Sequence, residues 1–384
     1  MRVGIACFGH GLGATGGVQV HLRGLLEALA SSDSSANSFV LLLGPDEPEP
    51  PEARQPRFSV ERVADRGLAV GPRWRRMARA LLGSSPGIER LGLDCVHYPA
   101  TRLLHPLRRT PVVLTFFDMQ EELLPGFFTR RERLARRLLH RWSVRRARLV
   151  IAPSRFTADC LVERYGTAPQ KITLVPAGVP QRCFAPAGVE EAAWLRGQGL
   201  EPGEYALYPA NPWPHKNHAA LMRAWGQLEP RPGGAPTLAC TGRLEGEPRW
   251  VDDLARAAGL PPGRVRDLGF VSEKDLGALL RGARLLVFPS LFEGFGLPVA
   301  EALAAGCPVA CSDLPPLREL TGDAARLFEP QDARSIAEAV TELWDGEAQR
   351  RLLAERGRER ARALAWPTLL PQLLAVYARA AGGD

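Results

Sequence analysis

Residues 289–306 read Pro289-Ser-Leu-Phe-Glu-Gly-Phe-Gly-Leu-Pro-Val-Ala-Glu301-Ala-Leu-Ala-Ala-Gly306. The residues before them, 284–288, end in the apolar run Leu285–Phe288, which predicts a buried strand at 284–288 that ends at Pro289. Pro298 suits the start of a helix and Gly306 suits its end, so a helix is predicted over 297–305. A strand, a glycine loop and a helix in this order form the repeating unit of a doubly wound α/β fold.

The same alternation of short apolar runs and amphipathic stretches extends on both sides of this motif. In the first half we expect strands and helices at the following residues: strands 2–8, 39–43, 94–98, 111–116, 148–152 and 172–175, and helices 17–30, 73–82, 129–146 and 155–165. In the second half we expect strands 204–209, 236–241, 265–268, 284–288 and 308–311, and helices 217–228, 250–258, 273–281, 297–305, 332–344 and 347–363.

The Pro- and Gly-rich stretch 180–203 separates the two series and is predicted to be a linker. The expected domains are therefore 1–182 and 203–365, each a doubly wound parallel sheet, with a ligand cleft between them. The last segment, 366–384, carries apolar residues at helical spacing after the second unit is complete. We expect it to form a helix that packs back on the first domain.

The composition is that of a globular protein, with 45% hydrophobic and 24% charged residues. The net charge of +7 is unevenly divided: residues 1–182 contain 27 Lys+Arg against 16 Asp+Glu, and residues 183–384 contain 22 against 26. Only three of the 49 basic residues are lysines. No apolar run approaches the ~18 residues of a membrane span, and the N-terminus resembles a strand rather than a signal peptide. Seven cysteines without C-x-x-C spacing favour a reduced, cytoplasmic protein.

The helix predicted at 297–305 would present backbone amides and a positive dipole end to a ligand, which suits a phosphate. Glu293 and Glu301 flank this end. Because carboxylates repel phosphate, their expected partners are hydroxyl groups, namely a ribose diol and the hydroxyls of a sugar. The alternative is an ordinary capped helix with Glu301 in solvent.

A second cluster, Tyr208-Pro-Ala-Asn-Pro-Trp-Pro-His-Lys-Asn-His218, begins at the end of the strand predicted at 204–209. Lys216 stands at the mouth of the next helix, where it could neutralise a departing diphosphate. The alternative is an exposed loop lysine. His215 and His218 have no third ligand at a suitable spacing, so we expect no metal. A third cluster, Gly9-His-Gly-Leu-Gly-Ala-Thr-Gly-Gly17, lacks the acidic residue of a dinucleotide site and is interpreted as a glycine loop open to a substrate.

These three clusters, with Ala147-Arg-Leu-Val-Ile-Ala-Pro-Ser154, together resemble the family 4 (group 1) glycosyltransferases over nearly the whole chain. The resemblance implies the GT-B fold of two Rossmann-like domains, and retaining transfer of a hexose from a nucleotide-sugar without a metal or other cofactor. By residue matching, Glu293 would bind the donor hexose and Glu301 the ribose. The donor site would further include the residues Gly16, Gly17, Lys216, Gly294, Phe295, Gly296 and Leu297.

Two positions depart from the family pattern. Ala210 stands where the family often has an arginine, so Lys216 would need help from Arg243, Asn211 or His215. The family's His-Asp pair on the acceptor side is Phe117-Asp118 here, and Asp118 would orient the acceptor or donor with Gln120. An inactive member remains an alternative.

Catalysis would rest on electrostatics and positioning, with Lys216, Glu293 and Asp118 as the catalytic candidates. We see no well-placed carboxylate nucleophile, which favours front-face attack by an acceptor hydroxyl. The competing functions are a sugar-nucleotide epimerase of the same architecture and a non-catalytic nucleotide-sugar-binding subunit. A glycogen-type phosphorylase would need a pyridoxal lysine, and we see no candidate for it once Lys216 is assigned to the phosphates.

The stretch 130–148 contains nine arginines. Leu134, Leu138 and Trp142 share one stripe of the predicted helix, which we interpret as core packing. The arginines form a solvated face or dock on an anionic membrane, where a glycan or lipid-linked acceptor would lie. Nucleic acid is a poorer partner, because no stacking platform accompanies the charge. The expected location is the cytoplasm, at or near the inner face of the membrane.

Overall fold

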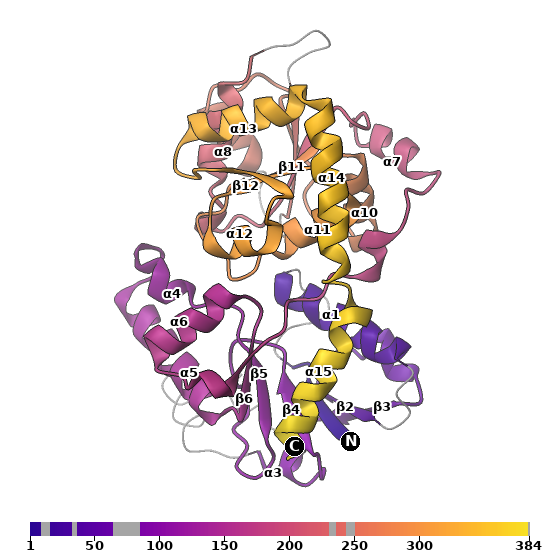
Figure 1. Ribbon diagram of the computed structural model, residues 1–384, viewed down its shortest axis with the longest axis vertical. Coiled ribbons are helices and arrows are strands. Elements are labelled where there is room, and N and C mark those ends of the chain that lie inside the picture. Colours follow the sequence, from indigo (N-terminus) through magenta and orange to yellow (C-terminus); the bar gives the residue numbers. More distant parts are fainter. Residues whose placement is uncertain (9–15, 33–36, 64–84, 230–235, 243–249, 383–384) are drawn as a thin grey trace. The chain divides into compact units, whose positions relative to one another are not determined.

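The computed structural model describes residues 1–8, 16–32, 37–63, 85–229, 236–242 and 250–382 (Figure 1). These residues form two parallel sheets, of seven and six strands, with strand orders β3-β2-β1-β4-β5-β6-β7 and β10-β9-β8-β11-β12-β13. In each sheet the strand order reverses direction once, between β1 and β4 and between β8 and β11. The predicted class of two doubly wound parallel sheets is therefore confirmed.

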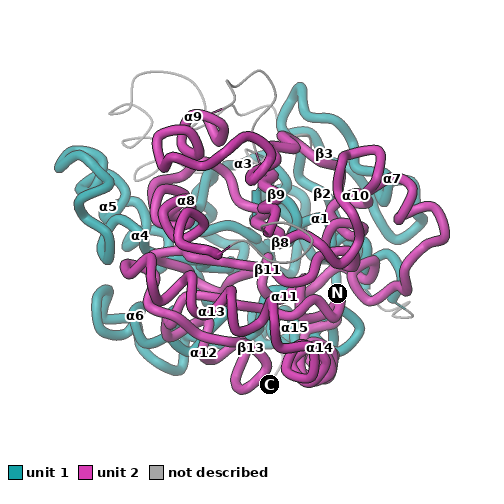
Figure 2. Tube along the Cα trace, turned by 90° about the horizontal axis from the view of Figure 1, so that it is seen from above, with its two compact units in different colours: residues 1–178, 366–384 teal, residues 179–365 magenta. Residues whose placement is uncertain are grey.

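Two compact units contain one sheet each: residues 1–178 with 366–384, and residues 179–365 (Figure 2). Unit 1 has strands β1 (Arg2–Ala6), β2 (Ser38–Leu43), β3 (Phe58–Arg62), β4 (Cys95–Tyr98), β5 (Val112–Thr115), β6 (Leu149–Ala152) and β7 (Ile172–Leu174). Its described helices are α1 (Gly17–Ser31), α3 (Pro86–Glu89), α4 (Gln120–Leu123), α5 (Arg130–Arg146), α6 (Arg155–Tyr165) and α15 (Trp366–Ala381), with short 3-10 turns η1 (Pro51–Arg54), η2 (Pro125–Phe127) and η3 (Pro169–Lys171).

Unit 2 has strands β8 (Tyr205–Pro209), β9 (Thr237–Thr241), β10 (Val265–Asp267), β11 (Leu285–Phe288), β12 (Val309–Ser312) and β13 (Ala325–Phe328). Its described helices are α7 (Glu191–Gly197), α8 (His218–Gly226), α9 (Trp250–Ala257), α10 (Glu273–Gly282), α11 (Leu297–Ala305), α12 (Pro315–Thr321), α13 (Ala333–Asp345) and α14 (Glu347–Arg362), with 3-10 turns η4 (Gln181–Phe184) and η5 (Pro214–Lys216). None of the described helices in either unit is both long and apolar enough to cross a membrane.

The last helix, α15, is part of unit 1 although it follows unit 2 in the sequence (Figure 2). Its apolar face, including Leu370 and Leu373, joins the core that α1 forms against the sheet. Tyr377 of α15 hydrogen-bonds His97 of β4 at 2.8 Å, and the other ring nitrogen of His97 lies 2.8 Å from Thr115 Oγ1. Burial lowers the pKa of His97 to about 3, so this buried imidazole is neutral. Helix α15 is thus fixed by both apolar packing and a polar contact.

Trp366, the first residue of α15, fills a slot that two glycines leave open. A Cβ at Gly24 would lie 2.3 Å from its indole Nε1, and a Cβ at Gly178 would lie 2.4 Å from its Cε2. Both glycines are therefore required by the close approach of a rigid ring rather than by their own backbone conformation.

The sequence-based assignment missed the short elements and misplaced the linker. Segment 180–203, expected as a linker, contains η4 and α7 and belongs to unit 2, where α7 packs on α10. Strands β3 and β13 and helices α3, α4 and α12 were also not predicted. These elements are short and have little periodicity of their own, so tertiary contacts stabilise them. The helix predicted at 73–82 lies outside the described residues.

Candidate functional site

The two loops that follow β8 and β11 lie at the point in unit 2 where the strand order reverses. Such a switch point is where open α/β sheets bind ligands. The loop after β8 carries Lys216 and the loop after β11 carries Glu293, and Lys216 Nζ lies 2.5 Å from Glu293 Oε1. Their side chains are only 15% and 11% exposed, and the ammonium stands 5.1 Å from the centre of the Phe288 ring. The structure thus brings together the two residues that the sequence placed 77 positions apart.

The backbone around Lys216 is held to the end of β11. Asn217 adopts a left-handed conformation with φ 61°, and its side-chain amide donates to the carbonyls of Pro289 and Pro330 at 3.1 and 2.7 Å. The amide of Leu291 donates to the His215 carbonyl at 2.7 Å, and the hydroxyl of Tyr208 donates to the carbonyl of Lys216. These bonds hold together the two loops that carry Lys216 and Glu293.

Helix α11 begins at this site with an unusual backbone. Gly296 is its N-cap, with φ 98°, and a Cβ there would lie 2.4 Å from Leu317 Cδ2. Its carbonyl accepts from the amides of Val299 and Ala300 at 2.9 and 3.1 Å. No acidic residue stands in the first turn, so the positive end of the helix dipole is not locally neutralised. The predicted donor residues Gly294, Phe295, Gly296 and Leu297 all lie in this loop and first turn.

Glu301 is buried in α11, with 4% of the residue exposed. The alternative of a solvated helix residue is therefore wrong. Its carboxylate lies 3.6 Å from Arg182 Nη2, and Arg182 also pairs with Glu273 at 3.0 Å. Burial raises the pKa of Glu301 to about 7, while Arg182 acts to lower it and Glu273 to raise it. A buried carboxylate is stable only with polar partners, and the hydroxyl groups of a ligand could act as such partners.

The remaining unit 2 candidates differ in what the structure shows. Asn211 is partly exposed directly after β8, and its backbone amide would meet a Cβ placed at Gly242. Ala210, which stands in place of the family's arginine, is buried. Arg243 lies outside the described residues. His215 and His218 have pKa values lowered by burial to about 3 and about 4, so both are neutral. No group of three His, Cys, Asp or Glu in the described part of the chain could hold a metal ion.

In unit 1 the predicted residues follow two strands. Gly16 caps α1 and Gly17 is its first residue, and a Cβ at Gly17 would meet nothing within 4 Å. Phe117, at the position of the family's histidine, follows β5 and packs edge-on against His21 with ring centres 5.1 Å apart. Its amide and carbonyl are held by hydroxyls of Thr101 and Thr157, each at 3.4 Å. Asp118 is the next residue, so the hydrogen bonds of the Phe117 backbone also restrict where the backbone of Asp118 can lie.

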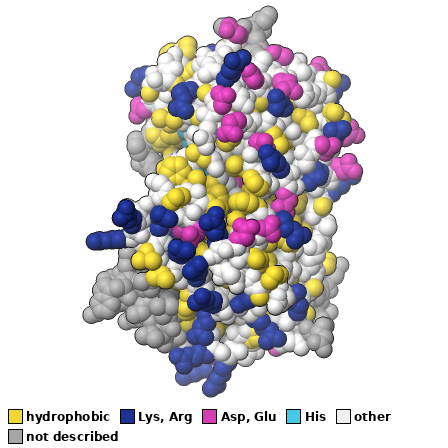
Figure 3. Space-filling model, turned by 60° about the vertical axis from the view of Figure 1, so that its left-hand side comes forward, with side chains coloured by type: hydrophobic (Ala, Val, Ile, Leu, Met, Phe, Trp, Pro, Cys, Tyr) yellow, Lys and Arg dark blue, Asp and Glu magenta, His cyan; other side chains and the backbone are white. Residues whose placement is uncertain are grey.

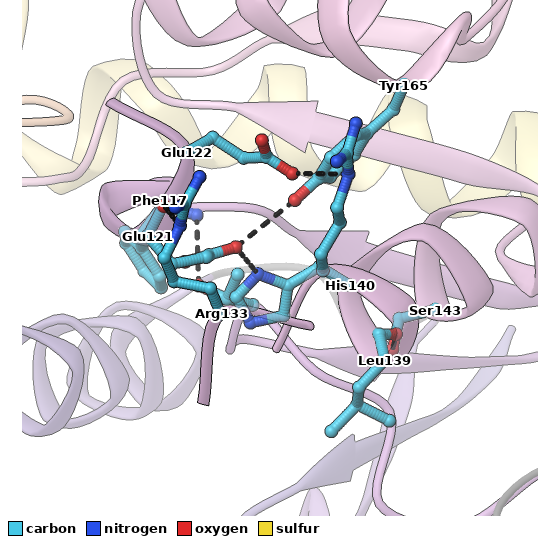
Figure 4. Close-up of polar contacts among 10 residues, drawn as sticks. Phe117, Glu121, Glu122, Arg133, Leu139, His140, Ser143 and Tyr165 are labelled. Carbon is cyan, nitrogen blue, oxygen red and sulfur yellow. Dashed lines mark hydrogen bonds and ion pairs between the residues drawn. The ribbon is translucent and has the colours of Figure 1, made fainter. Parts of the chain in front are cut away.

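A buried polar cluster holds the segment after Asp118 in place (Figure 4). Glu121 of α4 accepts from His140 of α5 at 2.7 Å and from the hydroxyl of Tyr165 of α6 at 3.2 Å. Burial opposes ionisation of Glu121, but the hydrogen bonds from His140 and Tyr165 and the charge of His140 outweigh it and lower the pKa of this carboxyl. The backbone carbonyl of Glu121 also accepts from Arg133 Nε at 3.3 Å. Three helices of unit 1 are therefore tied together just beyond Asp118.

Sequence reasoning missed Arg182, Asn217 and the Glu121–His140 pair. Arg182 was assigned to the end of the first domain, and nothing in the local sequence associates it with Glu301. Asn217 could have been found, because asparagine tolerates the left-handed conformation needed between a tight loop and a helix. Glu121 and His140 are 19 positions apart on different helices, so only packing reveals the pair.

Two family models match the chain, one in each half. The model "Glycosyltransferase Family 4" matches residues 15–181, and the model "Glycosyl transferases group 1" matches residues 204–346. O-antigen chain mannosyltransferase B of Escherichia coli is 29% identical over 293 residues, which cover 73% of each protein. The chain spans 57% of the length of the next curated relative and about a quarter of two others.

Solved structures share the fold over almost the whole chain. Sucrose-phosphate synthase of Thermosynechococcus elongatus superposes with a TM-score of 0.79 at 20% sequence identity. The alignment covers 98% of this chain and 98% of that protein. Anabaena HepE, in complex with UDP-glucose, superposes with a TM-score of 0.75 at 18% sequence identity. The alignment covers 99% of this chain and 100% of HepE. At such identities the likeness concerns the fold. The expected fold of two Rossmann-like sheets of the GT-B type is confirmed.

Proposed function

The chain belongs to the glycosyltransferases of family 4 and group 1, and from this premise we propose that it moves a hexose from a nucleotide-diphosphate sugar to a hydroxyl of a glycan or lipid-linked acceptor. Transfer retains the anomeric configuration and needs no metal, and it serves polysaccharide or surface-glycan synthesis. The observation that carries this proposal is the enclosed Lys216–Glu293 pair at the start of α11. The name of the E. coli relative supports a hexose and a surface glycan.

Charge balance explains how this pair would serve the reaction. The ammonium of Lys216 is neutralised by its ion pair with Glu293. A bound diphosphate takes over Lys216 and places its negative charge at the positive end of α11, which frees the carboxylate of Glu293 to accept from hydroxyls of the donor hexose. As the glycosidic bond breaks, Lys216 and the helix amides stabilise the charge that builds on the leaving phosphate. This fixed positive charge does the work that a metal ion does elsewhere, which supports metal independence.

The acceptor would attack from the same face as the leaving group. We assign no described carboxylate of unit 2 as a nucleophile, because Glu293 would accept from hydroxyls of the donor hexose and Glu301 is buried beside Arg182. Asp118, next to the fixed Phe117, is assigned to orient the acceptor or the donor. Phe117 makes ring and backbone contacts but supplies no polar side-chain group, so the hydrogen bond of the family's histidine is absent at that position.

A panel of UDP-, GDP- and dTDP-sugars, glucose and mannose forms included, tests the proposed function. We expect one donor to be consumed in the presence of EDTA and an acceptor glycan, with NMR showing an α-linked product from an α-linked donor. An epimerase would instead interconvert the donor sugars without acceptor, and a binding subunit would raise its melting temperature without turnover. An inverted product or an absolute need for a divalent cation would contradict the proposal in that respect.

The outer face of α5 supports a membrane-bound acceptor. Leu134 and Leu138, expected in the core, are 59% and 48% exposed, and only Trp142 of that stripe packs against the core. The prediction failed because helical spacing identifies a stripe but not the side that the protein covers. Phe127, 43% exposed in the preceding turn η2, adds a third apolar group. Figure 3 brings this side of unit 1 forward and shows Lys and Arg side chains gathered among hydrophobic ones.

An apolar stripe flanked by arginines suits the boundary of an anionic bilayer, with leucines among the acyl chains and guanidinium groups at the phosphates. We propose that α5 docks unit 1 on the inner face of the membrane. Replacing Leu134 and Leu138 by serine is expected to weaken binding to vesicles of phosphatidylcholine and phosphatidylglycerol by about tenfold or more. Leu352→Ser, at an equally exposed leucine of α14, serves as the matched control. Vesicle co-sedimentation measures the binding. If the bound fraction did not change on replacing the two leucines, on omitting phosphatidylglycerol or on adding salt, the proposal would be overturned.

A further inference from the structure

Arg182 stands where the chain enters unit 2, and its contacts anchor it from both sides. Its guanidinium bridges Glu273, at the first residue of α10, and Glu301 in the middle of α11. Its backbone carbonyl accepts from Arg281 of α10 at 3.3 Å, and Arg281 is itself paired with Glu191 of α7. The side chain of Arg182 is one-quarter exposed, whereas that of Glu301 is almost fully enclosed. The arginine is therefore held in position to act on the carboxylate.

The charges around Glu301 come from two elements. Burial disfavours the ionised form of Glu301 most strongly. Arg182 from η4 favours the ionised form, and Glu273 from α10 disfavours it. Cys183 of η4 is buried nearby, with a thiol pKa raised by burial. Arg358 of α14 lies against Gly306 at the far end of α11, and Arg318 of α12 pairs with Asp313. Among the described residues, Arg182 is thus the cation that acts on Glu301.

We propose that Arg182 is a positioning residue that sets the charge and orientation of the Glu301 carboxylate, and through it the recognition of the donor's ribose diol. This inference rests on the proposed function. An ionised carboxylate accepts hydrogen bonds from both hydroxyls of a vicinal diol, whereas a protonated carboxyl has lost part of its accepting capacity. Because Glu301 is buried with a pKa of about 7, its ionisation near neutral pH depends on the neighbouring charges.

The first measurement is the ratio of affinities for a nucleoside diphosphate and its 2′,3′-dideoxy counterpart. UDP and GDP are both used, because the base is unidentified. Hydrogen bonds to a charged group predict that the wild-type protein prefers the ribose form by about 10- to 100-fold. We expect Arg182→Gln to remove most of this preference while leaving affinity for the dideoxy form within about twofold. Arg182→Lys, which keeps the charge, restores part of it. The control is Arg196→Gln, in an exposed pair with Glu201.

The second measurement is the pH dependence of the same ratio, in which titration of the diphosphate cancels. The wild-type ratio should fall as the pH drops through about 7, because Glu301 becomes protonated. Removing the cation in Arg182→Gln raises the pKa of Glu301 and moves this fall to higher pH. Removing the neighbouring carboxylate in Glu273→Gln lowers the pKa and moves the fall to lower pH. A general loss of structure would move both variants in the same direction, so opposite shifts identify the electrostatic role.

The outcomes separate this inference from the function on which it rests. If no nucleoside diphosphate binds the wild-type protein, the proposed function fails. If Glu301→Gln abolishes the ribose preference while Arg182→Gln keeps both the preference and its pH dependence, the inference fails and the function stands. Thermal melting of each variant identifies any that does not fold, and Glu273→Gln then still tests the direction of the pH shift.

Discussion

Replacing Lys216 or Glu293 by alanine is expected to lower turnover by about 10²–10³-fold, the usual effect of removing one preorganised stabiliser of transition-state charge. Without Lys216, the negative charge that builds on the leaving phosphate is no longer stabilised by an ammonium group. Without Glu293, the hexose loses a carboxylate that accepts from its hydroxyls. The measurement is steady-state turnover with the donor that the nucleotide-sugar panel identifies, at saturating acceptor.

The ion pair complicates these variants, because removing one partner leaves the other charge enclosed and unpaired. The double variant, in which both residues are alanine, removes both charges and should be at least as stable as either single variant while remaining inactive. Lys274→Ala is the matched control, because Lys274 is an exposed lysine on α10. Turnover within about threefold of wild type in a folded Lys216→Ala or Glu293→Ala protein would disprove the assignment of the site.

Replacing Gly242 by alanine is expected to reduce the free energy of unfolding of unit 2 by about 2–5 kcal/mol. Gly242 has φ 106°, a conformation that alanine adopts only with strain. A Cβ there would also lie 2.6 Å from the carbonyl carbon of Ala210 and 2.8 Å from the amide nitrogen of Asn211. These are backbone atoms at the start of the Lys216 loop, so they cannot move aside without displacing the candidate site.

A matched glycine separates strain from steric conflict. Gly263 has φ 86°, but a Cβ there would meet nothing within 4 Å. Gly263→Ala should therefore reduce the free energy of unfolding by only about 1–2 kcal/mol, the strain alone. Urea denaturation of both variants measures the difference, and nucleotide affinity should fall in Gly242→Ala only. If both substitutions reduced the free energy of unfolding equally, the contact with Ala210 and Asn211 would cost no stability, and the prediction would be wrong.

The two loops that form the candidate site could be located from the sequence because the residues of each loop follow one strand closely. Glu293, Gly296 and the start of α11 lie within a few residues of one strand end, and Lys216 follows another strand at a similar distance. Parallel strands place their carboxyl ends on one edge, so two such loops meet when their strands are neighbours. The exposed side of α5 could not be predicted, since Leu134 and Leu138 have the same spacing as core residues.

The sequence by itself determined the doubly wound architecture, the helix 297–305 with its glycine ends, and the candidates Lys216 and Glu293. These depend on periodicity, on backbone preferences of Gly and Pro and on residue chemistry, which are properties of short segments. Only the tertiary structure decided that Glu301 is buried, that Arg182 rather than a sequence neighbour acts on its carboxylate, and that segment 180–203 belongs to unit 2. Burial and charge–charge contacts arise between elements far apart in the chain, so the charge state of Glu301 is a property of the packed protein.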